Sequence, residues 1–360
     1  MKNDGLKTFL CLILCVSLVV FSLCEGERAV VFVSSLISGE NASASINIHS
    51  GDNAVYDDIY SVTGYGGGGY VNASASITPT DIEALKSQAK KLFKNYTKAG
   101  NIKETYMGAT GKTITYGVVK VDNKTSESVN IKSLLNQKPS LGEITKEKPY
   151  ILIYHTHTTE GYELLDLGWY AKEYNSRTKD ESKNMVRVGD ELTRVLQEAG
   201  YNVIHDRNIY DASYDGAYAR SRVSVDKYLK KYPSIKITLD VHRDAIQYSD
   251  GTKCKPTAEI NGKKASQVMI ISGCEGDGVE SFASWKQNLV FATHLQSQAE
   301  EMYPCLMRPV FFCNRKYNMD VTTCSLLLEF GTDANTLEES VYSAQLIGNA
   351  LAELLDKNKD

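Results

Sequence analysis

The segment Ile151-Leu-Ile-Tyr-His-Thr-His-Thr-Thr-Glu160 is an apolar run that leads directly into two histidines and a glutamate. A short apolar run of this kind predicts a β-strand that is buried in a sheet. In open α/β sheets, ligands bind beyond the carboxyl ends of the strands. We therefore expect the functional site to lie where the strand 150–154 ends, with His155, His157 and Glu160 close to it.

Predicted strands and helices alternate from residue 148 to the C-terminus. We expect strands at 150–154, 201–205, 235–241, 267–272, 309–313 and 325–330, and helices at 181–199, 214–231, 285–302 and 337–355. Such alternation is typical of a mainly parallel sheet with helices against both faces. The expected fold class is therefore α/β, with a mainly parallel twisted sheet and helices on both faces.

Two later strands also end in residues that suit metal chemistry. The strand 235–241 is followed by His242, and the apolar run 326–328 is followed by Glu329. A carboxylate at the end of an apolar strand is costly to bury unless it is paired or used. Because the ends of neighbouring parallel strands meet at one edge of a sheet, we expect His242 and Glu329 to lie near the first histidines.

Imidazole and carboxylate groups together suit a zinc ion. A hydrolytic zinc site needs three protein ligands and an open position for water, and His157, Glu160 and His242 can supply the three. Alternation along the strand places His155 on the same face as His157, so either histidine can be the ligand. We prefer His157 because it shares the spacing His-x-x-Glu with Glu160.

The composition excludes several other classes of protein. The chain has 360 residues, a net charge of −4 and eight cysteines. This weakly acidic balance lacks the positive field that holds a polyanion, so we expect no nucleic-acid partner. The cysteines form no CxxC pairs, which argues against a zinc ribbon and against a disulfide framework.

The N-terminal region has the character of a targeting segment. Lys2 and Lys7 precede the apolar stretch 8–24, which is typical of a signal peptide or of an uncleaved membrane anchor. We favour an anchor region at 1–37 that leaves the body of the protein outside the membrane. Residues 38–79 are rich in Gly, Ser and Ala and contain the hexapeptide NASASI twice, which predicts a flexible linker.

Residues 80–147 separate the linker from the alternating region. An apolar stripe predicts a helix at 80–98 that ends before Gly100, and a strand follows at 113–121. We expect this segment to form a small, β-rich α+β subdomain that precedes a catalytic domain at 148–360.

From about Gly108 onward, and in its N-terminal anchor, the chain resembles the stage II sporulation protein P family. The matching stretches are Ile153–Tyr162, Asn184–Asp190, Ala217–Arg222, Tyr232–Lys236, Asp240–Asp244 and Leu328–Thr332. The resemblance implies a domain similar to zinc-dependent N-acetylmuramoyl-L-alanine amidases, with a sheet similar to that of zinc carboxypeptidases.

The resemblance also implies an activity and a setting. It implies a peptidoglycan hydrolase that cuts the amide between stem peptide and glycan, and the peptide cross-links, during engulfment of the forespore. Zinc would be held by His157, Glu160 and His242, with Glu329 as the general base; the amidase pattern leaves Glu181 as the alternative to Glu160. The protein would be anchored in the cell membrane at the engulfing septum, with its catalytic domain outside the cytoplasm, and would work with stage II sporulation proteins D and M.

Two other functions are compatible with the same residues. One is a zinc carboxypeptidase or endopeptidase that acts only on stem peptides. The other is a catalytically silent, wall-binding scaffold, against which the full set of two histidines and two glutamates argues. The cleavage products of purified peptidoglycan distinguish the three.

Overall fold

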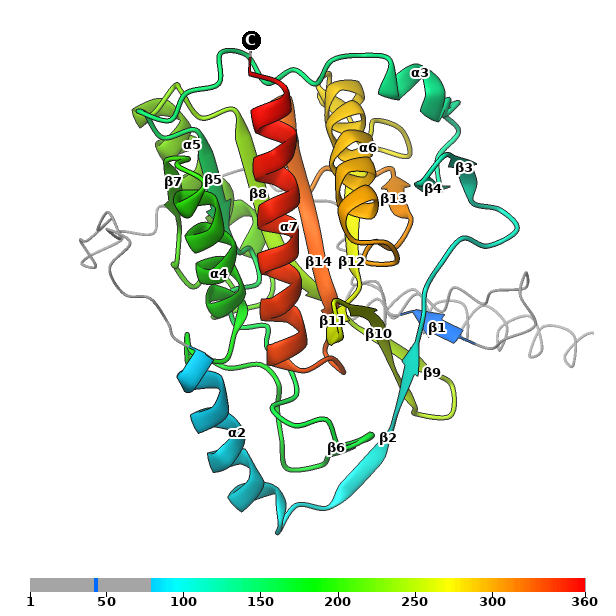
Figure 1. The fold of residues 1–360 in the computed structure, drawn as a ribbon, viewed down its shortest axis with the longest axis vertical. Coiled ribbons are helices and arrows are strands. Elements are labelled where there is room, and N and C mark those ends of the chain that lie inside the picture. Colours follow the sequence, from blue (N-terminus) through cyan, green and yellow to red (C-terminus); the bar gives the residue numbers. More distant parts are fainter. Residues whose placement is uncertain (1–41, 45–78, 360) are drawn as a thin grey trace, which may run out of the picture.

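The computed structural model describes residues 42–44 and 79–359 (Figure 1). The predicted anchor at 1–37 lies outside the described residues, as does the predicted linker except for residues 42–44 and 79. Within the part of the chain that is described, no helix has both the length and the apolar character needed to cross a membrane.

The main sheet has eight strands, and most neighbouring pairs in it are parallel. Its order is β3 (Ile114–Tyr116), β4 (Val119–Asn123), β13 (Val310–Cys313), β12 (Val268–Gly273), β14 (Cys324–Thr332), β8 (Ile237–Asp244), β5 (Ile151–Tyr154) and β7 (Val203–His205). The neighbours from β14 to β7 are parallel, and so are those from β4 to β12. Only the β3–β4 and β12–β14 pairs are antiparallel. The prediction of a mainly parallel sheet is confirmed.

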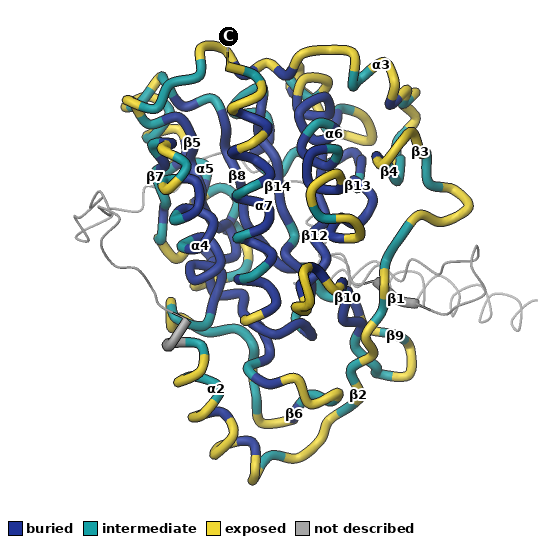
Figure 2. The backbone as a smooth tube through the Cα atoms, in the orientation of Figure 1, coloured by how far each residue is buried: buried dark blue, intermediate teal, exposed yellow. Residues whose placement is uncertain are grey.

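Helices cover both faces of this sheet. The helices α4 (Met185–Glu198), α6 (Trp285–Met302) and α7 (Leu337–Lys357) lie on one face, and α5 (Ala217–Lys231) lies on the other (Figure 1). Within β5, Ile151 and Ile153 pack with α4, whereas Leu152 and Tyr154 pack with Val225 of α5. All four residues of β5 are therefore buried, as Figure 2 shows for the central strands. This double burial explains why the strand is a continuous apolar run rather than an alternating one.

The strands that carry the candidate site are longer than predicted. β8 continues through His242 to Asp244, and β14 continues through Glu329 to Thr332. Glu329 lies directly beside His242 in the register, and the register then shifts between Glu329 and Thr332, which pairs with Asp244. Both side chains therefore project from paired strands rather than from the loops that follow them, and this fixes their relative position.

A second, smaller sheet lies at one end of the main sheet (Figure 1) and was not predicted. Its strands run in the order β1 (Ala42–Ala44), β9 (Ile246–Tyr248), β10 (Lys253–Ile260), β2 (Lys98–Thr105) and β6 (Trp169–Ala171), and β11 (Lys263–Ser266) pairs with β10. Lysines recur in β10 and β11, so their sequence lacks the apolar pattern that marks a strand.

The segment before residue 148 contributes strands to both sheets. Its helix α2 (Pro79–Phe93) ends five residues earlier than predicted, and Gly100 lies within β2. The predicted strand at 113–121 is a hairpin, because the chain turns at Gly117, which has a φ of 60°. A short helix, α3 (Ile131–Leu135), follows, capped by Asn130. β4 pairs with β13 and β2 with β10; the domain boundary at residue 147 stays a prediction.

Candidate active site

One cavity of about 70 Å³ brings the predicted site residues together. It lies at the carboxyl ends of β5, β8 and β14, and His157, Glu160, His242 and Glu329 all line it. The remainder of its wall includes three tyrosines, Tyr214, Tyr218 and Tyr317. Side chains that follow or end three strands therefore lie around one cavity.

A tight turn after β5 brings His157 and Glu160 to the same side. The backbone N–H of Glu160 donates to the carbonyl of His157 over 3.0 Å, which closes the turn. Thr156, inside the turn, donates from its backbone N–H and its hydroxyl to the two oxygens of Asp240 on β8, over 2.8 and 2.6 Å. Asp240 thereby ties the turn to the neighbouring strand.

His157 points into the cavity and His155 does not. The His157 ring stacks on Tyr214, with centroids 4.5 Å apart and planes 5° apart, and stands perpendicular to His242 at 5.4 Å. His155 is instead fully buried, with Nδ1 2.9 Å from the carbonyl oxygen of Val241 and Nε2 2.8 Å from Nε2 of His205.

Burial of the His155–His205 pair has a structural explanation in α4. A Cβ atom at Gly189 would lie 2.5 Å from the His205 ring and 2.6 Å from the His155 ring, so the lack of a side chain there leaves room for both. Burial, and next the neighbouring His205, lower the pKa of His155 well below its usual value. His155 is therefore a neutral, packed group, and the arrangement favours His157 as the ligand.

His242 lies between two carboxylates. Its Nε2 is 2.8 Å from Oδ1 of Asp240, and its Nδ1 is 3.5 Å from Oε2 of Glu160. Burial would lower the pKa of His242, but the two carboxylates outweigh it and raise that pKa well above its usual value. Burial would likewise raise the pKa of Glu160. The effects of His242, Arg177 and Arg243 outweigh burial, and the pKa of Glu160 is therefore lowered.

The spacing of His242 and Glu160 fits a zinc ion. Two atoms that each lie about 2.1 Å from a tetrahedral zinc are about 3.4 Å apart, close to the 3.5 Å between Nδ1 of His242 and Oε2 of Glu160. Oδ1 of Asp240 lies 2.8 Å from the other ring nitrogen, Nε2, although this pair lacks hydrogen-bond geometry. Within residues 42–44 and 79–359, His157 does not bring a third ligand atom within 4.8 Å of both.

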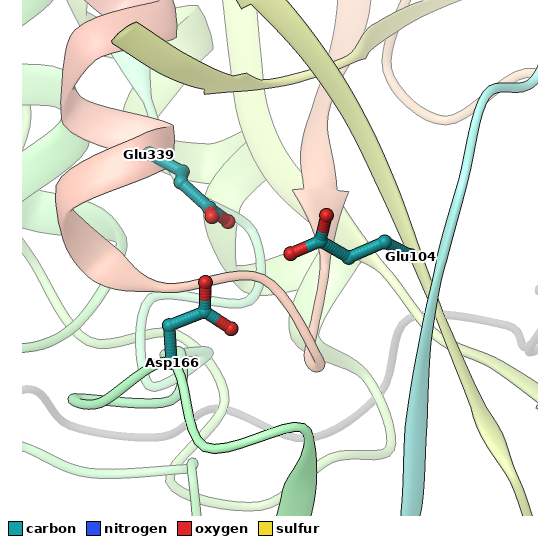
Figure 3. A group of neighbouring side chains, drawn as sticks. All are labelled: Glu104, Asp166 and Glu339. Atoms are coloured by element: carbon teal, nitrogen blue, oxygen red, sulfur yellow. The ribbon is translucent and has the colours of Figure 1, made fainter.

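Three other carboxylates do approach one another that closely. Glu104, Asp166 and Glu339 each offer an oxygen within 4.8 Å of the other two, and Figure 3 shows them pointing toward a common centre. The buried ammonium of Lys255 lies 2.8 Å from Asp166, 2.8 Å from Glu339 and 3.2 Å from Glu104. This group, which we name the lysine cluster, already contains its cation, so we assign it a structural role.

Glu329 presents an unpaired oxygen at the site. The residue is partly exposed, but its Oε2 is buried and has no hydrogen-bond partner among the described residues. Burial, and next the charges of Asp244 and Glu160, raise the pKa of Glu329 to about 8, although His242 opposes the shift. A carboxyl group in this state can both accept and release a proton near neutral pH.

Glu181, which the resemblance left as the alternative to Glu160, lies outside the cavity, and two further polar residues, Asn184 and Arg243, have partners of their own. Glu181 is exposed and pairs with Arg207 over 2.6 Å, outside the cavity, so it is not in position to replace Glu160. Asn184 caps α4, accepting from the backbone N–H of Val186 over 3.0 Å. Arg243 lines the cavity, but its guanidinium donates to the carbonyl of Gly161 over 2.8 Å.

The aromatic wall of the cavity was missed by the sequence analysis. Tyr218 and Tyr317 stack with centroids 5.0 Å apart and planes 22° apart. Tyr317 has a φ of 43°, in the left-handed region that bulky residues rarely adopt, and Asn318 beside it has a φ of 55°. The spacing of four between Tyr214 and Tyr218 at the start of a predicted helix was a usable signal; nothing local marked Tyr317.

Comparison with known sequences gives one family. A sequence model described as stage II sporulation protein P matches residues 72–352. Stage II sporulation protein P of Bacillus subtilis (strain 168) is 29% identical over 230 residues, which are 61% of this chain and 54% of that protein. The chain thus matches about half the length of this curated relative.

Two amidases are among the solved structures to which the chain shows similarity. The N-acetylmuramoyl-L-alanine amidase AmiC2 of Nostoc punctiforme is 12% identical, with a TM-score of 0.34, over 60% of this chain and 98% of that one. The N-acetylmuramoyl-L-alanine amidase from Clostridium difficile 630 is 13% identical, with a TM-score of 0.35, over 59% of this chain and 100% of that one.

Proposed function

The chain belongs to the stage II sporulation protein P family, and we propose that it is a zinc-dependent peptidoglycan hydrolase that cleaves the N-acetylmuramoyl-L-alanine amide. The observation that carries the proposal is the convergence of His157, Glu160, His242 and Glu329 on one cavity. These residues come from three separate segments, and carboxylates are costly to bury together unless they are paired or used.

We expect His157, Glu160 and His242 to hold the zinc ion. Bound zinc would polarise the scissile carbonyl and lower the pKa of a water toward about 7. Oδ1 of Asp240 lies beside Nε2 of His242, so Nδ1 is the ring nitrogen on the metal side. The His157 ring, which stacks on Tyr214, has to move to complete the set.

Glu329 is the residue proposed to move the proton. Its Oε2, which has no partner among the described residues, would take a proton from the attacking water and return it to the leaving amide nitrogen. Oε2 is suited to this role because no other hydrogen bond competes for it. In this proposal three side chains bind the metal, and the fourth, Glu329, transfers the proton.

The setting of the reaction is proposed from family membership. We expect the region 1–37 to anchor the protein in the cell membrane with its catalytic domain outside the cytoplasm. There it would act on peptidoglycan at the engulfing septum, together with stage II sporulation proteins D and M. Cleavage of peptide cross-links by the same site is part of this proposal.

Products decide between this activity and its alternatives. The full-length chain is incubated with purified peptidoglycan, with and without a zinc chelator, and the fragments are identified by mass spectrometry. An amidase frees intact stem peptides from bare glycan, and the chelator abolishes their release. A peptidase gives only shortened or uncrosslinked stem peptides, and a silent scaffold gives no fragments; either result refutes the amidase proposal.

The role of Glu329 has a separate test. Glu329→Ala is expected to keep bound zinc and to lower the cleavage rate about 100- to 10,000-fold, as loss of a general base does. Zinc content by elemental analysis and product release are measured together. The matched control is Glu259→Ala on the exposed part of β10, which should change neither. If Glu329→Ala also loses zinc, Glu329 is a ligand rather than the base.

A further inference from the structure

Arg177 contacts the candidate site from a loop, not from the end of one of the strands that carry the other site residues. It lies between β6 and α4, and its side chain is 30% exposed. One end of its guanidinium, Nη2, lies 3.1 Å from Oε1 of Glu160, and the other, Nη1, lies 2.9 Å from Oδ2 of Asp211. The same guanidinium lies over the ring of Tyr214, 5.3 Å from its centroid. Arg177 therefore contacts one predicted zinc ligand directly and the aromatic support of another.

The loop that carries Arg177 is held against the turn after β5. The backbone N–H of Thr178 donates to the carbonyl of Thr159 over 2.8 Å. A Cβ atom at Gly161 would lie 2.3 Å from the carbonyl oxygen of Ser176, so the loop can pack here only because residue 161 is glycine. Asp211 also accepts from the hydroxyl of Thr159 over 2.6 Å. These contacts fix where the guanidinium sits.

The contacts divide the two oxygens of Glu160 between different partners. Oε1 is bound by Arg177, whereas Oε2 faces Nδ1 of His242 at 3.5 Å and accepts from the backbone N–H of Arg243 over 3.3 Å. A guanidinium hydrogen bond uses acceptor capacity of the first oxygen, so metal binding through the second oxygen is favoured. Bidentate binding by Glu160 would instead occupy the position that a hydrolytic zinc site keeps open for water.

We propose that Arg177 is a positioning residue that makes Glu160 a one-oxygen zinc ligand and thereby keeps a coordination position open. The proposal rests on the proposed zinc function. An arginine suits this role because its planar fork binds Glu160 and Asp211 at once, which the single ammonium of a lysine does not reproduce.

The test compares two arginines that have the same exposure. Arg177→Met removes the fork but keeps an unbranched side chain against Tyr214. Arg207→Met is the matched control, because Arg207 is also 30% exposed and also bridges two carboxylates, Glu181 at 2.6 Å and Asp190 at 2.8 Å, away from the cavity. The full-length chain and both variants are titrated with zinc, and their complexes with cobalt(II) are compared by absorption spectroscopy.

We expect Arg177→Met to weaken zinc binding by about 10- to 100-fold, as loss of a residue that supports a ligand does. The visible cobalt bands should weaken from the intensity of a four-coordinate site toward that of a five-coordinate site. Arg207→Met should match the unmodified chain in both measurements. Circular dichroism of the metal-free variants checks that each is folded.

Two results overturn the inference, and they differ. If the unmodified chain binds zinc and Arg177→Met gives the same affinity and the same cobalt spectrum, Arg177 has no positioning role, while the proposed zinc function stands. If the unmodified chain binds neither metal, or if His242→Ala binds zinc equally well, the zinc function fails and the inference fails with it.

Discussion

Two groups of acidic side chains in this molecule are similar in composition and differ in what they face. In the lysine cluster, Glu104, Asp166 and Glu339 surround an ammonium group that the chain itself supplies. In the candidate site, Glu160 and Glu329 share a cavity with two imidazoles, and Oε2 of Glu329 has no partner among the described residues.

The difference shows that close carboxylates do not by themselves indicate a metal centre. The lysine cluster has the tighter geometry, yet all three of its carboxylates already contact the ammonium of Lys255, and two of them also contact that of Lys264. The candidate site has the looser geometry, but it combines the nitrogen and oxygen ligands that zinc prefers with an open cavity. Ligand type, together with an oxygen of Glu329 that has no partner among the described residues, separates the two groups better than distance alone.

The largest expected effect comes from His242→Ala in the candidate site. Loss of this imidazole removes a zinc ligand and leaves Asp240 and Glu160 without their common partner. Zinc binding and cleavage should both be lost, with the cleavage rate falling more than about 1,000-fold, or about 4 kcal/mol in the barrier. Elemental analysis and the peptidoglycan assay measure the two effects.

The control for this variant is His294→Ala. His294 lies on α6, outside the cavity, with Nε2 2.9 Å from the carbonyl oxygen of Gln137. It should keep zinc and activity. A His242→Ala protein that retains full zinc and full activity would show that the candidate site is not the metal centre. The distinction between the candidate site and the lysine cluster would then be wrong.

The second-largest effect is expected from a substitution in the lysine cluster, which should lower the free energy of unfolding without affecting zinc binding. Lys255→Met leaves Glu339, which is buried, without its cation, and breaking a buried pair in this way costs about 3–5 kcal/mol. The free energy of unfolding in urea measures the loss, and the zinc content of the folded protein should not change.

Lys264→Met supplies the matched control, because Lys264 contacts two of the same carboxylates but is half exposed. Its loss should cost no more than about 1 kcal/mol. Loss of a bound metal from Lys255→Met, without unfolding, would contradict the structural role of the cluster.

The two regions also differ in how far the sequence predicts them. β5 was predictable because burial on both faces makes it a continuous apolar run. The turn 157–160 was predictable because its spacing is local, and α6 has the bounds 285–302 that its periodicity indicated. The site could be anticipated because it lies where such strands end.

The remainder depends on contacts between distant segments. A lysine is ordinarily expected to be exposed, and Lys255 can be buried because carboxylates from β2, from α7 and from the loop before β6 surround it. The position of Arg177 depends on how a loop packs on Gly161, and that of Tyr317 on a left-handed backbone. Such features carry no periodic signal, so a single sequence did not reveal them.

Another buried carboxyl group, Glu163, sharpens the comparison with a smaller and pH-dependent effect. Its Oε2 resembles that of Glu329 in having no hydrogen-bond partner among the described residues, but Glu163 does not line the cavity. Burial is the main cause that raises the pKa of Glu163 to about 7, with Lys253 opposing it and Asp333 adding to it. Because Glu163 has no proposed role in the reaction, its ionisation should only lower the free energy of unfolding.

The sign follows from the raised pKa. Because the folded state holds this proton more tightly than the unfolded state, the stability of the fold falls as the pH rises from about 4.5 through about 7. The shift corresponds to about 3 kcal/mol above pH 8. Glu163→Gln should therefore be more stable than the unmodified chain by up to that amount at pH 8 and nearly equal to it at pH 4.5, as measured by urea unfolding at both pH values. Glu259→Gln, on the exposed part of β10, should show no such pH dependence. An equal gain from Glu163→Gln at both pH values would mean that packing, rather than the buried charge, sets the cost of this residue.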